Sequence, residues 1–176
     1  MIYLENYFES EYQKELKDLY YSAFPKEERP PFFYFLHCAK KKTSELYVIR
    51  DEKKFIGLAC FSKEKDLVCL MWFAIDEKLR GQGYGTSLLN LMKEKYQGYR
   101  LSLACEKVSG EYSNYEERKK RKSFYEHNGY KSMDYIFTEY GVDYEIMCCN
   151  GKISKEEYRK VNGNFFGQFL YNLISR

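Results

Sequence analysis

The nine consecutive apolar residues from Leu67 to Ile75 most narrowly limit how this chain can fold. A strand with apolar side chains on both faces fits the centre of a sheet that is covered on both sides. Asp76 and the glycine-rich segment 80–85 follow, and a helical apolar pattern starts near Thr86. The sequence therefore predicts a central buried strand that turns directly into a helix.

Apolar spacing elsewhere predicts alternating helices and strands around this central strand. Spacings of three and four residues indicate helices, and alternation indicates strands. The helices are expected at 9–24, 30–40, 86–96 and 113–129, and the strands at 46–50, 55–62, 67–75, 99–105, 130–140 and 144–149. Because a helix separates them, strands 67–75 and 99–105 should pair in parallel. The expected fold class is α/β, with a mixed sheet of about six to seven strands flanked by helices.

The chain divides into a domain over 1–150 and a C-terminal helical tail over 151–176. Ser-x-x-Glu motifs at Ser113 and Ser154 match the capping box and predict helix starts there. The apolar residues after Asn164 form one helical stripe: Phe165, Phe166, Phe169, Leu170, Leu173 and Ile174. Such a stripe must be covered, either by the tail's own domain or by a partner in a homodimer.

Composition and charge exclude several classes of protein. The 29 basic and 26 acidic residues give a formal charge of +3, a balance too even to require nucleic acid or an acidic membrane. The six cysteines form no Cys-x-x-Cys pair and no cluster with histidine, so no metal site is expected. No apolar run approaches the roughly 18 residues of a membrane span, and the first residues lack a secretory pattern. We therefore expect a cytoplasmic protein.

The segment Arg80-Gly81-Gln82-Gly83-Tyr84-Gly85, just before the helix at Thr86, is the best candidate for a binding site. The first N–H groups of a helix lack partners and carry positive potential, so they can hold a phosphate. Alternating glycines let the backbone approach such an anion without an obstructing Cβ. A tight turn with incidental glycines is the alternative. The sequence has neither the Rossmann nor the Walker pattern.

Two motifs in this order resemble the GNAT superfamily of N-acetyltransferases. Arg80-x-x-Gly83-x-Gly85, after an apolar strand and at the start of a helix, is similar to the family's pyrophosphate-binding motif A. The stretch Phe124-Tyr125-Glu126-His127-Asn128-Gly129-Tyr130 resembles its motif B. The resemblance extends over the order of elements from 9 to 149. It implies a central parallel pair of strands that splay apart, with acetyl-CoA as the co-substrate.

The resemblance also implies how acetyl-CoA is bound and used. Pantetheine would lie against Phe73, Ala74 and Ile75 at the end of the central strand. The pyrophosphate would bind the loop and the helix start: Arg80, Gly81, Gln82, Gly83, Tyr84, Gly85 and Thr86. An amine would attack the thioester directly, and the backbone N–H of Ala74 or Phe73 would stabilise the charge on oxygen.

Proton transfer requires an acid and a base. Tyr125 matches the position that family members commonly use to protonate the departing thiolate, although a buried structural tyrosine is the alternative. The incoming amine must lose a proton, and Glu106, directly after strand 99–105, is the candidate base, unless it is an ordinary surface glutamate. Weaker rivals are Glu27, Glu28 and Glu145, while His127 is more typical of a partly exposed helix residue.

The sequence departs from the common family pattern at Arg118, seven residues before the motif B tyrosine, where many relatives carry asparagine. How this helix holds the cofactor is therefore open. The basic run 118–122 is typical of a solvated helix face, with contact to CoA phosphates or to nucleic acid as alternatives.

The acceptor amine is left open between two classes. A small amine, such as a polyamine, an amino sugar or an amino-acid derivative, is favoured and would need an enclosed pocket. A protein or peptide amine would need an open groove between the first two helices and the closing hairpin. A module that senses acyl-CoA without turnover is the third possibility, and the retained Tyr125 argues against it.

Overall fold

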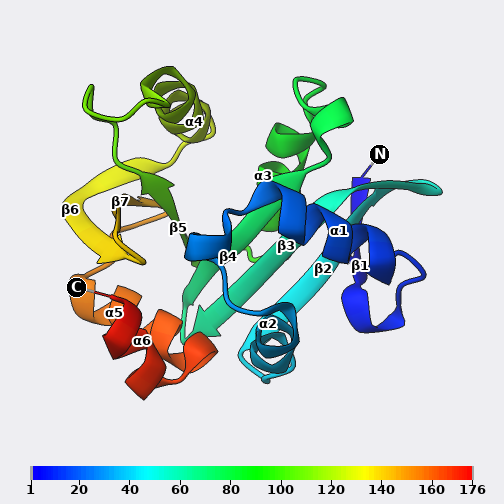
Figure 1. The fold of residues 1–176 in the computed structure, drawn as a ribbon, viewed down its shortest axis with the longest axis horizontal. Helices are drawn as coiled ribbons and strands as arrows, with labels where there is room; N and C mark the ends of the chain where they lie inside the picture. Colours follow the sequence, from blue (N-terminus) through cyan, green and yellow to red (C-terminus); the bar gives the residue numbers. More distant parts are fainter. Residues whose placement is uncertain (1, 176) are drawn as a thin grey trace.

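The computed structural model describes residues 2–175, apart from the side chain of Glu27, and contains one mixed sheet (Figure 1). Within this range seven strands follow the order β1-β2-β3-β4-β5-β7-β6. The strands are β1 Ile2–Asn6, β2 Ser44–Asp51, β3 Lys54–Glu64, β4 Leu67–Ile75, β5 Arg100–Glu106, β6 Lys131–Glu139 and β7 Val142–Cys149. The predicted α/β class and mixed sheet are confirmed.

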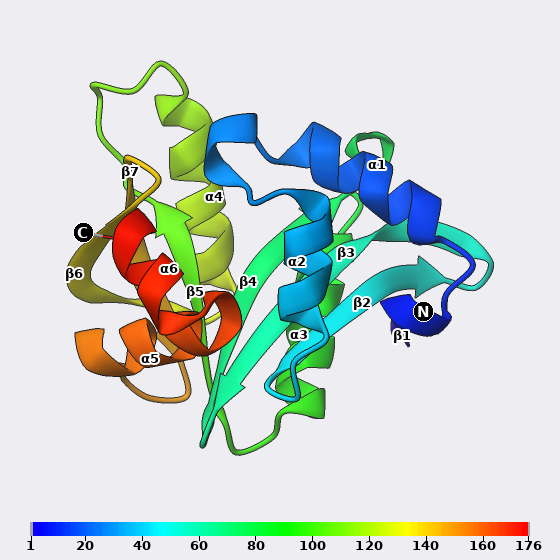
Figure 2. The ribbon, with the colours of Figure 1, turned by 60° about the horizontal axis from the view of Figure 1, so that its bottom comes forward.

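Helices cover both faces of this sheet (Figure 2). The α-helices within residues 2–175 are α1 Gln13–Ala23, α2 Phe32–Ala39, α3 Tyr84–Lys95, α4 Tyr115–His127, α5 Lys155–Phe166 and α6 Gln168–Ile174. The short 3-10 helices in the same range are η1 Tyr7–Glu9, η2 Lys26–Glu28 and η3 Glu77–Leu79. Helices α1, α2, α5 and α6 pack on one face, and α3 and α4 pack on the other.

The central pair of strands has the predicted direction. β4 and β5 are parallel, paired from Leu67 with Arg100 to Leu70 with Leu103. The other neighbouring strands are antiparallel. Helix α3 makes the crossover between β4 and β5, as its place in the sequence predicts.

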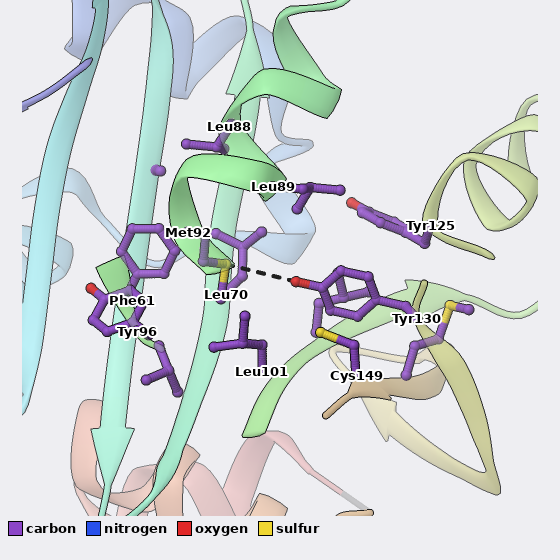
Figure 3. Close-up of a cluster of buried hydrophobic side chains, with 14 of the residues drawn as sticks. Phe61, Leu70, Leu88, Leu89, Met92, Tyr96, Leu101, Tyr125, Tyr130 and Cys149 are labelled. Carbon is purple, nitrogen blue, oxygen red and sulfur yellow. Dashed lines mark hydrogen bonds between the residues drawn. The ribbon is translucent and has the colours of Figure 1, made fainter. Parts of the chain in front are cut away.

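The core between the sheet and α3 fixes where that helix begins (Figure 3). Leu88, Leu89 and Met92 of α3 are fully buried against sheet residues such as Leu70. The Tyr130 hydroxyl donates to the sulfur of Met92 at 3.7 Å. This packing leaves little freedom for the start of α3, which lies at the end of β4.

The tail packs on the opposite face of the sheet. The Phe165 ring, fully buried on α5, lies 5.1 Å from the Trp72 ring and 6.3 Å from the Phe35 ring, centroid to centroid. The buried Ser62 hydroxyl donates to the Val161 carbonyl at 3.0 Å. These contacts join α5 to β3, β4 and α2. The division at 150 and a homodimer remain predictions.

The prediction of one continuous apolar stripe in the tail is wrong. Gly167 separates α5 from α6 with a φ of +91°, which turns the chain out of the first helical path. Phe165 and Phe166 before it are buried, whereas Phe169 and Leu173 after it are 77% and 67% exposed. The helical period therefore does not carry across the glycine.

Two further local features differ from expectation. β1 was not predicted; it pairs antiparallel with β2 as an edge strand. The capping box at Ser113 is absent, because α4 starts at Tyr115 with Asn114 as its N-cap and no side-chain cap. The side-chain oxygen Oδ1 of Asn114 instead accepts a hydrogen bond from Arg118 Nε at 2.8 Å. The capping box at Ser154 is confirmed.

The cysteines and the helices add three plain findings. All six cysteines are free and buried. No helix within residues 2–175 has the length and apolar character that crossing a membrane requires. The same residues contain no group of three or more His, Cys, Asp or Glu side chains that could hold a metal ion.

Candidate active site

A gap opens between the two central strands where their pairing stops. The ladder between β4 and β5 ends at Leu70 and Leu103, although β4 continues to Ile75 and β5 to Glu106. β5 keeps its antiparallel pairing with β7 as far as Glu106, opposite Tyr144. Among residues 2–175, the carboxyl-terminal half of β4 therefore faces no strand on its β5 side.

A β-bulge in β4 coincides with the start of this gap. Cys60 of β3 pairs with Trp72 and Phe61 pairs with Leu70, so Met71 is the extra residue. A bulge bends its strand and shifts the alternation of side chains by one residue. Leu70 accordingly packs on the α3 face, whereas Trp72 packs on the α1–α2 face. The bend directs the end of β4 away from β5.

The direction of the β4 backbone decides which N–H groups point into the gap. The Asp76 N–H donates to the Ile56 carbonyl on the β3 side at 2.9 Å. Alternate residues of a strand direct their backbone groups to opposite neighbours. The N–H groups of Phe73 and Ile75 therefore face the gap, while that of Ala74 faces β3. Of the two donors suggested by the sequence, Phe73 has the required direction.

The glycine-rich loop opens α3 beside the end of β4. Gly81 and Gly83 have φ angles of +76° and +83°, and a Cβ at either would have no neighbour within 4 Å. Gly83 is the N-cap of α3, and the first helical bond runs from the Ser87 N–H to the Gly83 carbonyl. The N–H groups at the start of α3 are thus left for another acceptor.

Side chains of the loop hold its shape. Arg80 Nε donates to the Ile75 carbonyl at 3.3 Å, which folds the loop back on the end of β4. Gln82 donates to the Lys78 carbonyl at 3.2 Å, and the Tyr84 hydroxyl donates to Asp51 at 3.2 Å. Gly85 lies under the ring of Phe124. Thr86 and Phe124 line the same surface groove. The loop is open to solvent and its backbone is accessible.

A groove of about 510 Å³ lies between the start of α3 and helix α4. Its lining residues are Thr86, Glu116, Lys119, Lys120, Ser123, Phe124, His127 and Asn128. Lys119 and Lys120 are exposed and carry positive charge along one side of it. A cationic groove next to free helical N–H groups is suited to an elongated anion with several phosphates.

Tyr125 is buried on α4, in the core that faces α3 and the end of β5. Its hydroxyl points toward Leu89 of α3 (Figure 3). Burial first, and the nearby Cys105 second, raise the pKa of Tyr125 well above its usual value, so the group is a neutral donor. No hydrogen-bond partner occupies this hydroxyl within residues 2–175, which leaves its proton available.

Glu106 ends β5 and is held by two arginines of α4. Arg118 contacts one carboxylate oxygen at 3.2 Å, and Arg121 is ion-paired to the other. The Arg118 side chain is 7% exposed, and its guanidinium stacks 3.7 Å from the Tyr112 ring centroid. The prediction that residues 118–122 form a solvated helix face is therefore wrong for Arg118. It agrees with the exposure of Lys119 and Lys120.

The rival carboxylates occupy different surroundings. Glu145 is ion-paired to Lys122 at 2.8 Å. Glu28 accepts a hydrogen bond from the Tyr144 hydroxyl at 2.7 Å. The side chain of Glu27 lies outside the described residues. His127 is exposed, and its Nδ1 lies 2.7 Å from the Ser123 carbonyl oxygen on the same helix.

The family model for the acetyltransferase (GNAT) domain matches residues 42–132, a little over half of the chain. The chain belongs to the GNAT acetyltransferase family. The matched residues include β4, the glycine-rich loop, α3, β5 and α4, which together form the site. This GNAT chain is therefore an acetyltransferase whose central elements are those of its family.

Solved structures have the same fold at low sequence identity. A GNAT-family acetyltransferase from Bacteroides thetaiotaomicron is 19% identical with a TM-score of 0.75, over 92% of this chain and 93% of its own. The ribosomal-protein-S18-alanine N-acetyltransferase from Escherichia coli is 16% identical with a TM-score of 0.65, over 89% and 97%. An aminoglycoside 6′-N-acetyltransferase complexed with coenzyme A is 15% identical with a TM-score of 0.66, over 84% and 95%. No curated protein matches this chain in sequence.

Sequence reasoning located the GNAT loop but missed two contacts elsewhere in the fold. The buried Arg118 pair with Glu106 was hidden in a basic run that looked uniformly exposed. The hydrogen bond between Glu28 and Tyr144 joins residues 116 positions apart. No periodic signal connects them, so the fold was needed to find it.

Proposed function

We propose that this GNAT chain transfers an acetyl group from acetyl-CoA to a primary amine, with a small-molecule amine as the favoured acceptor. The observation that carries this proposal is the gap beyond Leu70 and Leu103, which opens beside the free N–H groups at the start of α3. The gap supplies a place for a thioester between two strands. The loop after β4 supplies a place for phosphates at the start of α3.

Acetyl-CoA is the donor that fits these surroundings. Gly81 and Gly83 leave an open cradle at the loop, and Arg80, Gln82, Tyr84, Gly85 and Thr86 complete its wall. Lys119 and Lys120 place two cations beside the groove that continues from it. The pantetheine would lie along the end of β4, formed by Phe73, Ala74 and Ile75. One solved neighbour of the same fold was determined with coenzyme A, which supports this assignment.

The reaction needs no covalent link to the protein. The amine nitrogen attacks the thioester carbonyl carbon, a C–N bond forms, and the C–S bond breaks. The Phe73 N–H stabilises the negative charge that develops on the carbonyl oxygen. Tyr125 donates its proton to the departing sulfur. Glu106, at the end of β5, is the proposed acceptor of the amine's proton. Its ion pairs with Arg118 and Arg121 would have to weaken for the carboxylate to accept that proton.

The first test is calorimetric titration of the purified protein with acetyl-CoA and with CoA, compared with Gly83→Glu. That variant places a side chain and a negative charge where the pyrophosphate should bind. Gly98→Glu is the matched control, because Gly98 also has a positive φ, +84°, and open space around its Cβ. We expect saturable binding by the wild type and by Gly98→Glu, and none by Gly83→Glu. Absence of wild-type binding would contradict the proposal.

Turnover separates the catalytic proposal from its alternatives. Release of free thiol with small amines supports the favoured acceptor class, and release only with peptides supports a protein or peptide acceptor. Binding of acetyl-CoA without any release supports a non-catalytic acyl-CoA sensor. We further propose a cytoplasmic protein without a nucleic-acid or membrane partner, since all six cysteines are free.

A further inference from the structure

One side of helix α4 carries both the tyrosine of the site and two arginines. Of the 13 residues of this helix, Arg118 and Tyr125 are the buried ones, and they lie two helical turns apart on the same side. Arg121 lies between them, four residues before Tyr125, so the two side chains are neighbours on the helix surface. This side of α4 faces the end of β5, where both arginines pair with Glu106.

The two arginines and Glu106 form a cluster with a net charge of +1, because two guanidinium groups share one carboxylate. The side chains of Arg118 and Glu106 are only 7% and 11% exposed. Water therefore screens the charge of this arginine–glutamate cluster less than it would screen charges on an open surface.

Nearby acidic side chains do not cancel this positive charge. Glu145, on β7, is paired to Lys122 at 2.8 Å. Asp143, closer to the start of β7, is paired to Lys107 at 3.6 Å. Glu126 of α4 is exposed to solvent. Each of the two pairs contributes one charge of either sign, so the arginine–glutamate cluster supplies the excess of positive charge at the end of β5.

The two arginines differ in what else they hold. Arg118 Nε donates to Asn114 Oδ1 at 2.8 Å, and its Nη1 donates to the Lys107 carbonyl at 3.1 Å. Arg118 thus fixes the loop between β5 and α4. Arg121 is 45% exposed and contributes a charge at the edge of the same cluster. We therefore expect substitutions of Arg121 to change the charge beside Tyr125 without loosening the loop.

The proposed reaction creates a negative charge at Tyr125. When the tyrosine gives its proton to the departing sulfur, a buried phenolate remains, and an anion in such surroundings is costly unless a cation lies close to it. Arg121, one turn away on α4, supplies that cation. Burial first, and Cys105 second, raise the pKa of Tyr125, and the charge of Arg121 acts against both.

We propose that Arg121 stabilises the negative charge that Tyr125 acquires as it protonates the departing thiolate. The proposal rests on the proposed acetyltransferase function and on the acid role of Tyr125. The amine's proton passes to Glu106, the C–S bond breaks, and the Tyr125 proton passes to sulfur. The cluster then gains one positive charge as Tyr125 gains one negative charge, and the two changes offset each other. Proton release by Glu106 and proton uptake by Tyr125, both through water, restore the starting state.

Arg121 is a positioning residue in this scheme, since it acts through Tyr125 and not on the substrate. The test measures turnover of the full chain with acetyl-CoA and the amine that gives most thiol release. Arg121→Gln should lower kcat about tenfold, with the KM for both substrates within about twofold of wild type. Arg121→Lys keeps the charge and should retain kcat within about threefold.

A double-mutant cycle identifies the residue through which Arg121 acts. In the Tyr125→Phe background no phenolate forms, so Arg121→Gln should lower kcat by less than about twofold. A radiolabelled acetyl group keeps these slow variants measurable. Arg159→Gln, on the exposed side of α5, removes the same charge on the other face of the sheet and should leave all constants unchanged.

A thermal melt of each variant establishes that it is folded. If folded Arg121→Gln has wild-type kcat, or lowers kcat equally with and without the Tyr125 hydroxyl, the role of Arg121 is overturned and the acetyltransferase is intact. Wild-type kcat in Tyr125→Phe overturns the acid role together with that of Arg121, while turnover persists. A wild type that binds acetyl-CoA but releases no thiol with any amine overturns the proposed function as well.

Discussion

The ring of Phe124 on α4 lies directly over Gly85 on α3. A Cβ built on Gly85 would come within 3.0 Å of the ring's Cζ and 3.7 Å of the Phe73 ring. Gly85 has an ordinary helical backbone, so contact and not φ explains the glycine. The two helices therefore meet at the glycine-rich loop through one aromatic ring.

This contact predicts that the effect of Gly85→Ala on the free energy of unfolding depends on residue 124: destabilising with Phe124 present and stabilising with alanine there. In the wild-type chain the added methyl group must displace the ring, and overpacking of this kind costs about 1–3 kcal/mol. With Phe124→Ala the obstacle is gone, and the helix preference of alanine over glycine should stabilise by up to about 1 kcal/mol. Urea unfolding of the four proteins in this double-mutant cycle measures both effects. Destabilisation in both backgrounds would show that another neighbour constrains Gly85.

Tyr125→Phe should separate catalysis from stability. The Tyr125 hydroxyl has no hydrogen-bond partner among residues 2–175, so we expect its loss to change the midpoint of thermal unfolding very little. Loss of a general acid should lower kcat by about 100-fold or more. Tyr130→Phe is the matched control, since its hydroxyl lies in the same core and donates to the Met92 sulfur. Equal turnover by Tyr125→Phe and Tyr130→Phe would remove the acid role.

The Glu45 carboxylate should make the free energy of unfolding depend on pH in the acidic range. Burial alone would raise its pKa, but hydrogen bonds from Lys63, Tyr47 and Tyr96 outweigh burial and lower it from 4.5 to about 2. A lowered pKa adds stability that is fully present above pH 4.5 and is lost as the pH falls toward 2.

We therefore expect Glu45→Gln to lower the free energy of unfolding at pH 7 by about 2 kcal/mol. The difference from wild type should shrink below pH 4.5 and disappear near pH 2. Chemical denaturation across this range measures it, with Glu94→Gln as the exposed control. A difference that is constant with pH would mean that Glu45 contributes through packing alone.

The tail offers a matched pair of phenylalanines. Phe165 is fully buried against Trp72, and Phe→Ala at such a site costs about 3–5 kcal/mol. Phe169, four residues later, is 77% exposed, and Phe169→Ala should change stability by less than about 0.5 kcal/mol. Differential scanning calorimetry of both variants tests whether α5 is part of the cooperative unit. Similar melting of Phe165→Ala and wild type would show that the tail docks only weakly.

The sequence predicted the parts of the site that are continuous in the chain. β4, the loop at Gly81 and Gly83, and the tyrosine of α4 follow one another within local patterns of period and glycine spacing. Those patterns reflect backbone chemistry, which does not depend on distant partners. The direction of the Phe73 N–H required a hydrogen bond between β3 and Asp76, which no local pattern encodes.

Sequence reasoning missed features of two kinds: those in which neighbouring residues compete for one structural role, and those that join residues far apart in the chain. Asn114, and not Ser113, is the N-cap of α4, and its side chain accepts from Arg118 instead of capping the helix, which a pattern that counts spacing alone does not detect. Gly167 ends α5, although the helical spacing of apolar residues in the sequence continues beyond it. Glu28, in the segment before α2, and Tyr144, near the start of β7, come together only in the folded chain.

The docking of α5 has a consequence for the chain as it is synthesised. Trp72 and Phe35 leave the ribosome long before Phe165, which covers them in the finished protein. Until that ring arrives, the part of this side of β3 and β4 that α1 and α2 do not cover stays exposed, and exposed apolar surface of this kind attracts other chains. The nascent protein is therefore most exposed to aggregation in the interval between the completion of its sheet and the emergence of α5.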